Sequence, residues 1–210
     1  MVYSAPTTTG ASVDASTGAV TWDNRGTTIG NSRSVTVTAT RVYTFKHDST
    51  YGGGSVTGSP ATKTATSTQD GNYVVSLSVS GKKLSYNNIA AGATSASPIH
   101  TLGTLTYTFS SNKTSTTTPS NTYGTLTSVT TYTLASSTNG FTKVNADTGV
   151  LTATSRGTDY GASTRTSATV TVSTKYTWTP TTAYNSAGTK TTTPTATATC
   201  TQEANLITKL

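Results

Sequence analysis

Hydrophobic and hydroxyl-bearing residues alternate over long stretches of this 210-residue chain. Between residues 33 and 45, Val35 and Val37 occupy alternate positions, and threonines fill the positions between them. The same period of two recurs in residues 167–178, and shorter runs of it occupy residues 73–79, 102–109 and 125–134. Alternation of this kind is typical of strands with one buried face and one exposed face. The pattern therefore predicts an all-β protein.

A long segment of the chain occurs twice. Residues 13–21 return as residues 144–152, and Arg25-Gly26-Thr27 returns as Arg156-Gly157-Thr158, each 131 positions later. Residues 34–38 are then matched by residues 167–171, and Thr68-Gln69 by Thr201-Gln202, each 133 positions later. Agreement that survives one small shift of register over about sixty residues indicates duplication rather than shared composition. In both copies of the first block, a Thr-Gly pair predicts a tight turn between two strands.

The duplication predicts two unequal units. Residues 73–210 contain enough predicted strands for a complete two-sheet sandwich. Residues 1–72 contain only the latter half of that plan. The first twelve of these residues are predicted to form a terminal arm or a short edge strand. A half-sandwich leaves strand edges open, which single chains avoid. We therefore expect the first unit to depend on a partner.

The chain termini are the candidate docking segments. Residues 206–210 lie 133 positions after residues 73–77, so the chain ends on the equivalent of a strand that opens a unit. One hypothesis is that this tail adds as a strand to an exposed edge, in the first unit or in a neighbouring subunit. The alternative is a short strand that completes the second unit's own sheet. The docking residues predicted from both termini are Met1, Val2, Tyr3, Leu206, Ile207 and Leu210.

Two loops are candidate contact loops. The run Tyr51-Gly52-Gly53-Gly54 corresponds to a loop that contains Tyr184 in the second copy. Exposed tyrosines of this kind stack on sugar rings, although packing that anchors the loop is the other interpretation.

Composition supports a folded chain. Hydrophobic residues make up only 32% of it, but Thr is roughly a quarter, and Val and Tyr accompany it, which favours strands over disorder. The net charge of +7 comes from scattered residues, so we expect no specific nucleic-acid binding. We also expect no membrane span and no secretory signal, and therefore synthesis in a cytoplasm.

Candidate chemistry is sparse. The chain has seven acidic residues, mostly in predicted turns, and two histidines far apart in sequence, His47 and His100. Neither histidine has cysteine or acidic neighbours at metal-ligand spacing, and no phosphate-binding or nucleophile motif is present. We therefore expect no catalytic residues, no metal and no cofactor.

The duplicated sequence segment resembles the group 2 type of bacterial immunoglobulin-like domains. In that family a (D/N)xxTGxVT turn and strand precedes a Gly turn and an alternating Val/Thr strand, and units end in a Thr-Val-Thr-Gln-like tail. Residues 14–21 and 145–152 fill the first position, and residues 66–69 and 199–202 fill the last. The resemblance covers residues 10–72 and the later half of the second unit. It implies an immunoglobulin-like β-sandwich, one complete unit plus a partial duplicated one, without catalytic residues.

The Thr/Ser/Tyr-rich composition and the run Trp22–Thr28 resemble virion proteins of crAss-like phages that infect Bacteroides. This resemblance implies an auxiliary capsid (head decoration) protein on the outer surface of the capsid, made in the host cytoplasm. Its expected partners are the major capsid protein lattice and neighbouring copies of itself, with host-surface glycans as a further candidate. The alternatives are a head or tail fibre subunit and a cell-surface glycan-binding adhesin module.

Overall fold

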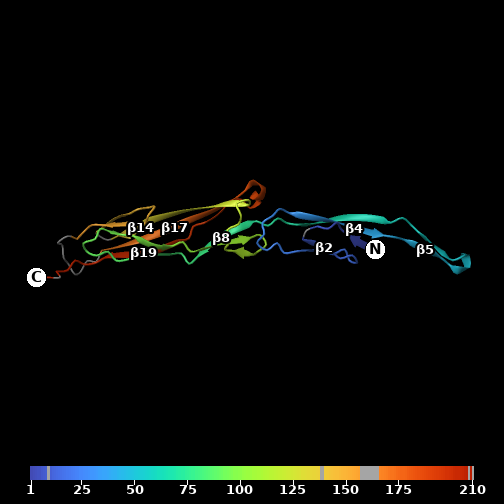
Figure 1. The fold of residues 1–210 in the computed structure, drawn as a ribbon, viewed down its shortest axis with the longest axis horizontal. Helices are drawn as coiled ribbons and strands as arrows, with labels where there is room; N and C mark the ends of the chain where they lie inside the picture. Colours follow the sequence, from blue (N-terminus) through green and yellow to red (C-terminus); the bar gives the residue numbers. More distant parts are fainter. Residues whose placement is uncertain (9, 138–139, 157–165, 208, 210) are drawn as a thin grey trace. The chain divides into compact units, whose positions relative to one another are not determined.

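The computed structural model describes residues 1–8, 10–137, 140–156, 166–207 and 209, and it shows antiparallel strands throughout (Figure 1). The described residues form no α-helix, only two short 3₁₀ helices, so the all-β prediction is confirmed. The chain divides into two compact units, Met1–Tyr73 and Val74–Leu210, called unit 1 and unit 2 below. Leu210, and Gly157 and Thr158 of the second Arg-Gly-Thr copy, lie outside the described residues.

Unit 1 contains three small sheets with the strand orders β1-β4-β7, β2-β3 and β5-β6. Its elements are β1 (Val2–Ser4), β2 (Ala11–Val13), β3 (Val20–Trp22), β4 (Arg33–Arg41), β5 (Thr44–His47), η1 (Ser49–Tyr51), β6 (Gly54–Thr57) and β7 (Ala61–Gln69).

Unit 2 has more strands than unit 1. Its elements are β8 (Val74–Ser80), β9 (Lys83–Tyr86), β10 (Ser95–Ala96), β11 (Pro98–Thr101), β12 (Thr104–Phe109), β13 (Thr114–Ser115), β14 (Gly124–Ser137), β15 (Phe141–Val144), β16 (Leu151–Ala153), β17 (Thr166–Pro180), η2 (Thr182–Ala187), β18 (Lys190–Thr192) and β19 (Thr195–Gln202). The long strand β17 pairs with β14, β18 and β19, while β8, β12 and β13 form a separate sheet, as do β9 and β11.

In the central sheets of the two units, equivalent residues lie opposite each other on neighbouring strands. In unit 1, Tyr3 lies opposite Ala39. In unit 2, Tyr132 lies opposite Val172, which is the duplicate of Ala39. Strand β1 is therefore the counterpart of the end of β14. Residues 2–4 form the short edge strand that was one of the two interpretations of the N-terminus.

The duplicated turn is closed by one side-chain oxygen in each unit. Asp14 Oδ1 accepts hydrogen bonds from the backbone N–H groups two and three residues further on, at 2.9 and 2.7 Å. Asn145 Oδ1 accepts the matching pair at 3.0 and 2.9 Å. Gly18 and Gly149 complete the two turns with φ of 75° and 73°, a region that L side chains rarely adopt. The turn predicted from the Thr-Gly pair is present in both units.

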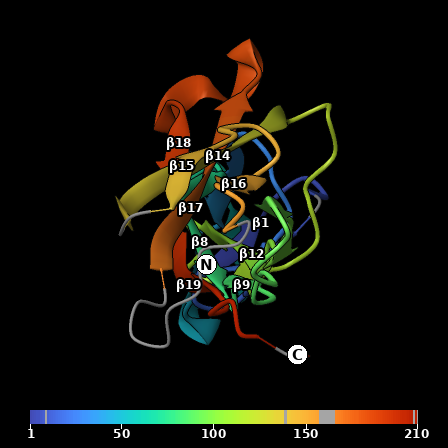
Figure 2. The ribbon, with the colours of Figure 1, turned by 90° about the vertical axis from the view of Figure 1, so that its left-hand side faces the viewer.

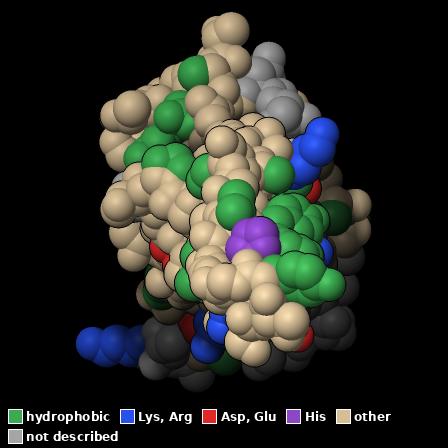
Figure 3. Space-filling model, turned by 90° about the vertical axis from the view of Figure 1, so that its right-hand side faces the viewer, with side chains coloured by type: hydrophobic (Ala, Val, Ile, Leu, Met, Phe, Trp, Pro, Cys, Tyr) green, Lys and Arg blue, Asp and Glu red, His purple; other side chains and the backbone are tan. Residues whose placement is uncertain are grey.

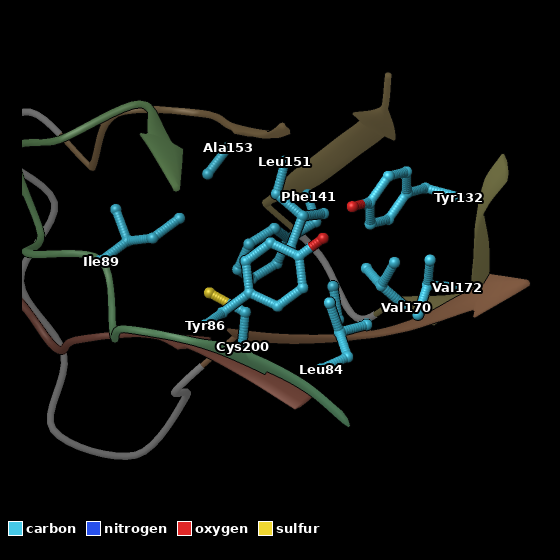
Figure 4. Close-up of a cluster of buried hydrophobic side chains, with 11 residues drawn as sticks. Leu84, Tyr86, Ile89, Tyr132, Phe141, Leu151, Ala153, Val170, Val172 and Cys200 are labelled. Atoms are coloured by element: carbon cyan, nitrogen blue, oxygen red, sulfur yellow. The ribbon is translucent and has the colours of Figure 1, made fainter. Parts of the chain in front are cut away.

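The core of unit 2 is closed by residues from β9 and the loop that follows it (Figure 4). Leu84, Tyr86 and Ile89 belong to one buried cluster with Val170 and Val172 of β17. The same cluster includes Tyr132, Phe141, Leu151, Ala153, Ala168 and Cys200. Figure 2 shows β9 and β12 on one side of this unit and β14 and β17 on the other. The core is therefore enclosed between layers of strands.

Unit 1 has a much smaller core. Among its described residues the buried hydrophobic side chains are Ile29, Val35 and Val37. Every residue of β5 and β6 is exposed. A two-stranded hairpin that is exposed on both faces gains little from burial. Unit 1 therefore has strands without a covering layer.

Candidate docking surface

The duplication allows each position of unit 1 to be compared with its counterpart in unit 2. Phe45 is 67% exposed, whereas its counterpart Trp178 is 2% exposed. Tyr43 is 59% exposed, whereas its counterpart Tyr176 is 7% exposed. Equivalent aromatic positions are therefore buried in one unit and open to solvent in the other.

The opening strands of unit 2 provide the cover that unit 1 lacks. The ring of Tyr107, from β12, meets the ring of Trp178 edge-on, with centroids 5.9 Å apart and planes at 81°. Val74 and Leu77 of β8 are buried as well, and β8 lies beside β18, the strand that pairs with Tyr176 and Trp178. Among the described residues of unit 1, no strand takes the place of β8 or β12.

A groove of about 270 Å³ in unit 1 marks a second uncovered position. Its apolar lining includes Tyr3, Val20, Val37 and Ala39, and Lys63 stands at its rim. The counterparts in unit 2 are Tyr132, Leu151, Val170 and Val172, which belong to the core that Leu84 and Tyr86 cover. The groove is thus the place where unit 1 lacks a strand like β9.

We call Tyr43 and Phe45, together with the groove residues Tyr3, Val20 and Ala39, the open face of unit 1. The view of unit 1 in Figure 3 shows hydrophobic side chains gathered around a histidine on the surface. Phe45 and His47 are in edge-on ring contact, with centroids 5.2 Å apart. Arg41 lies over the ring of Tyr43 at 4.7 Å. An apolar surface with flanking cations is typical of a protein interaction site.

The structure places the predicted terminal docking residues in different settings. Met1 and Val2 are exposed. Tyr3 is half-buried, because its ring lies against Gly18 in the duplicated turn. Leu206 and Ile207 are 62% and 60% exposed, and no strand includes them. Leu210 lies outside the described residues.

The two candidate contact loops also differ. Tyr51 is 83% exposed at the end of η1, a 3₁₀ helix capped by Asp48, whose Oδ1 accepts a hydrogen bond from Thr50 N. Gly52 and Gly53 follow in positive-φ conformations, and Gly54 begins β6. Tyr184 is half-buried and in edge-on contact with Tyr123, at 5.1 Å between ring centroids. Tyr51 is presented to solvent, whereas Tyr184 anchors its loop.

Sequence reasoning did not include Tyr43 and Phe45 among the site residues. The signal was available, because both were aligned with Tyr176 and Trp178 in the duplication. What the alignment did not show is that the layer covering these aromatics belongs to the non-duplicated residues 74–123. Only the comparison of burial makes the difference visible.

In unit 1, Asp23, Arg25 and Arg33 line a small cavity of about 210 Å³ together with Asn24 and Thr28. No group of three or more His, Cys, Asp or Glu residues that could hold a metal ion is found in this part of the chain. Backbone hydrogen bonds from Thr17 and Ser16 lower the pKa of Asp14, which fits a turn-closing role. The ion pair between Asp23 and Arg33 lies beside Gln69, which accepts a hydrogen bond from Arg33 Nε at 2.7 Å.

His100 is half-buried in unit 2. Its Nδ1 lies 3.0 Å from the hydroxyl of Tyr132. Burial, together with the charge of Lys82, lowers the pKa of His100. Lys82 donates a hydrogen bond to Thr174, and burial lowers its pKa as well. These contacts join β11 to β14, and the turn before β9 to β17.

No helix in the described part of the chain is long and apolar enough to cross a membrane.

Comparisons with known proteins find only distant likeness. No protein-family model and no curated protein matches the chain. It is similar to a solved structure of the protocadherin gammaB7 EC3-6 cis-dimer, with 13% identity and a TM-score of 0.30 over 96% of this chain and 40% of that chain. It is also similar to the protocadherin gammaB4 extracellular domain, with 12% identity and a TM-score of 0.25 over 95% of this chain and 27% of that chain. The chain thus spans less than half the length of either structure, and likeness at this level leaves its family open.

Proposed function

We propose that this chain is a non-enzymatic structural protein of a phage virion, an auxiliary capsid protein that binds and reinforces the capsid lattice. Its immunoglobulin-like loops would be displayed on the outer surface. One observation supports a docking role above all others: Phe45 and Tyr43 are exposed in unit 1, whereas their counterparts Trp178 and Tyr176 are buried. The virion setting is inferred from the resemblance of the sequence to crAss-like phage proteins.

The physical argument for docking concerns the free energy gained when exposed apolar side chains are buried. Fully burying an aromatic or large aliphatic side chain contributes about 1.5–3 kcal/mol. A chain that exposes several such side chains on one face gains that energy when a partner covers them. On a repetitive lattice, many copies bind side by side, and the small gains per copy combine. The expected partners are the major capsid protein lattice and neighbouring copies of this chain.

Sedimentation with phage heads that lack this protein tests the proposal. We expect stoichiometric co-sedimentation of the full chain with heads. Phe45→Ser should weaken it at least tenfold, which corresponds to a loss of about 1.4 kcal/mol. Val129→Ser is the matched control, because Val129 is 65% exposed on a strand of unit 2 and lies outside the open face. Heads that fail to bind the folded full chain would refute the capsid role.

A glycan-binding module is the second candidate, favoured by the exposure of Tyr51. A tyrosine that is 83% exposed beside Gly52 and Gly53 is accessible to the flat face of a sugar ring. Retention of the purified chain on Bacteroides polysaccharide, lost in Tyr51→Ala, would support this function. Retention without head binding would favour the adhesive role over the capsid role.

A further inference from the structure

We propose that a cavity in unit 1 binds one oxyanion, which is either the carboxylate of an acidic side chain from a partner protein or a free anion such as inorganic phosphate. The cavity has a volume of about 210 Å³. Its lining residues are Asp23, Asn24, Arg25, Thr28 and Arg33, and it is called the arginine cavity below. It lies at a different place from the open face, because Arg33 begins β4 and Tyr43 follows the end of that strand.

One side chain holds both arginines of the cavity in place. Gln69 Oε1 accepts a hydrogen bond from Arg25 Nε at 3.1 Å and another from Arg33 Nε at 2.7 Å. Gln69 is itself held by its Nε2, which donates to Asp23 O at 2.7 Å. Arg25 also lies against Gly30, where a Cβ would come within 3.0 Å of Arg25 Nη1. Both guanidinium groups are therefore positioned before any ligand binds, which lowers the cost of binding.

The charges of the arginine cavity do not balance. Arg33 forms an ion pair with Asp23. Arg25 is half-buried, and its Nε donates to the neutral amide oxygen of Gln69. No carboxylate in the described part of the chain forms an ion pair with Arg25. Arginine is always charged in proteins, and removing a charge from water without a counter-ion is unfavourable. An oxyanion in the cavity would supply the missing counter-charge.

The turn that carries Arg25 adds neutral donors to the cavity. Thr28 N donates to Arg25 O at 2.9 Å, which closes the turn and brings the Thr28 hydroxyl to the same cavity as the guanidinium. Asn24 Oδ1 accepts a hydrogen bond from Gly26 N at 2.8 Å, so the Nδ2 of Asn24 keeps its two N–H groups to donate. Guanidinium, amide and hydroxyl donors around one cavity suit the several lone pairs of an oxyanion.

The arginine cavity favours a small oxyanion over other ligands. A divalent cation needs several oxygen ligands, whereas the cavity has one carboxylate, that of Asp23, and it is already paired with Arg33. A large anion is disfavoured by size, because about 210 Å³ corresponds to only a few water molecules at about 30 Å³ each. A carboxylate or a single phosphate group is small enough, and either one accepts two parallel hydrogen bonds from a guanidinium.

Titration of the ¹⁵N-labelled full chain with inorganic phosphate at constant ionic strength tests the site. We expect the Nε–Hε signal of Arg25 and the amide signal of Thr28 to shift and to saturate, with a Kd of about 1 mM. Arg25→Gln should weaken binding at least tenfold, because it removes the uncompensated charge. Arg25→Lys keeps the charge without the planar fork and should bind with intermediate affinity. Arg41→Gln is the matched control and should bind as the wild type does, because Arg41 is exposed and lies over Tyr43, outside the cavity.

Asp23→Asn tests the electrostatic argument in the opposite direction. It removes the one carboxylate that lines the cavity, so phosphate should bind at least threefold more tightly than to the wild type. Circular dichroism and urea unfolding of each variant show that it is folded before it is titrated.

Sedimentation with phage heads distinguishes the two sources of the oxyanion. If a carboxylate of the partner enters the cavity, Arg25→Gln should weaken co-sedimentation at least tenfold, and phosphate at about ten times its Kd should compete with the heads. If heads bind Arg25→Gln as they bind the wild type, while phosphate still saturates the wild type, the ligand is a free anion. Both results support the site. Heads that do not bind the full chain would refute the capsid role, and the phosphate titration would still decide this proposal.

Three results would overturn the oxyanion site. The first is the absence of a saturable shift of the Thr28 amide with phosphate. The second is equal phosphate affinity in Arg25→Gln and the wild type. The third is a loss of affinity in Arg41→Gln as large as that in Arg25→Gln, which would show that phosphate responds to the overall charge and not to the cavity.

Discussion

Asn145 shows how one side-chain oxygen defines a turn in this protein. Its Oδ1 accepts two backbone N–H groups, and Asp14 does the same in unit 1. We expect Asn145→Ala to lower the free energy of unfolding of unit 2 by about 1–2 kcal/mol, because two N–H groups lose their acceptor. Asn145→Asp is the control and should cost far less, since Asp performs this role in unit 1. Urea unfolding curves measure both, and equal losses would contradict the capping role.

Gly149 combines a backbone and a packing requirement. A Cβ at this position would lie 2.6 Å from the ring of Tyr132 and 2.8 Å from Pro98, at a φ of 73°. We expect Gly149→Ala to destabilise the protein by about 2–4 kcal/mol, the sum of strain and overpacking. Gly81→Ala separates the two causes, because Gly81 has the same φ of 73° and no atom near its Cβ position. It should cost about 1 kcal/mol. Thermal unfolding of both variants would contradict this account if the losses were the same.

Tyr86 makes the stability of unit 2 sensitive to alkaline pH. Its hydroxyl donates a hydrogen bond to Gly149 O at 2.6 Å, and burial, with smaller contributions from Tyr132 and Cys200, raises its pKa to about 12. Because the folded state favours the neutral phenol, the contribution to stability is complete below pH 10 and is lost as the pH rises towards 12.

We therefore expect the urea midpoint of unit 2 to fall between pH 10 and 12, and the fall to be shallower in Tyr86→Phe. Some dependence should remain, because burial also raises the pKa of Tyr107 and Tyr132. A fall that is identical in the wild type and in Tyr86→Phe would show that Tyr86 does not cause it.

The sequence predicted the structural role of some of these residues but not of others. The turn around Gly18 and Gly149 could be predicted, because a Thr-Gly pair at the same place in two copies has one physical meaning. Tyr86 could not, because its role depends on a contact with a residue 63 positions away. A pattern of alternating side chains shows which residues face inward, but it does not show what each one meets there.

At the scale of elements, Gln202 and Gln69 join strands to loops in both units. Gln202 is 1% exposed, and its Nε2 donates to Ala93 O at 3.2 Å and to Thr154 O at 2.9 Å. Gln69 Nε2 donates to Asp23 O, the counterpart of Thr154 O. We expect Gln202→Met to destabilise unit 2 by about 1–3 kcal/mol, because it removes a buried amide that donates to two loop carbonyls. Gln69→Met should cost less, since Gln69 is only half-buried. Urea unfolding of both variants tests the order, and a larger loss in Gln69→Met would reverse it.

Elements were predictable where they are long and regular. Strands β4 and β17 follow directly from their alternation, and β7 and β19 follow from the duplication. Strand β1 was harder, because it has three residues and the spacing between Tyr3 and Tyr132 differs from that of the neighbouring repeats. Its place in the sheet is set by its pairing with β4, which lies about thirty residues further along the chain and cannot be inferred from three residues.

At the scale of the whole molecule, the sequence predicted that the two units are unequal, and the structure shows what the difference is. The duplicated strands build a sheet and a turn in each unit, but the covering strands β8, β9 and β12 belong to unit 2. The open face of unit 1 follows from that difference. Its partner could not be predicted from the composition, because the same apolar face would suit any segment with the right alternation.

This inequality predicts different stabilities for the isolated units. Residues 74–210 contain the whole cluster of Leu84, Tyr86, Val170 and their neighbours, so we expect this fragment to fold alone and to unfold cooperatively in urea. Residues 1–73 bury only three hydrophobic side chains among those described, and a chain of that length is marginal even with a full core. We expect this fragment to be largely unfolded, or to unfold at much lower urea concentrations.

Circular dichroism and urea titration of the two fragments provide the measurement. If residues 1–73 alone were as stable as residues 74–210, the exposed aromatics would not mark an incomplete unit, and the physical case for a docking surface on unit 1 would fail.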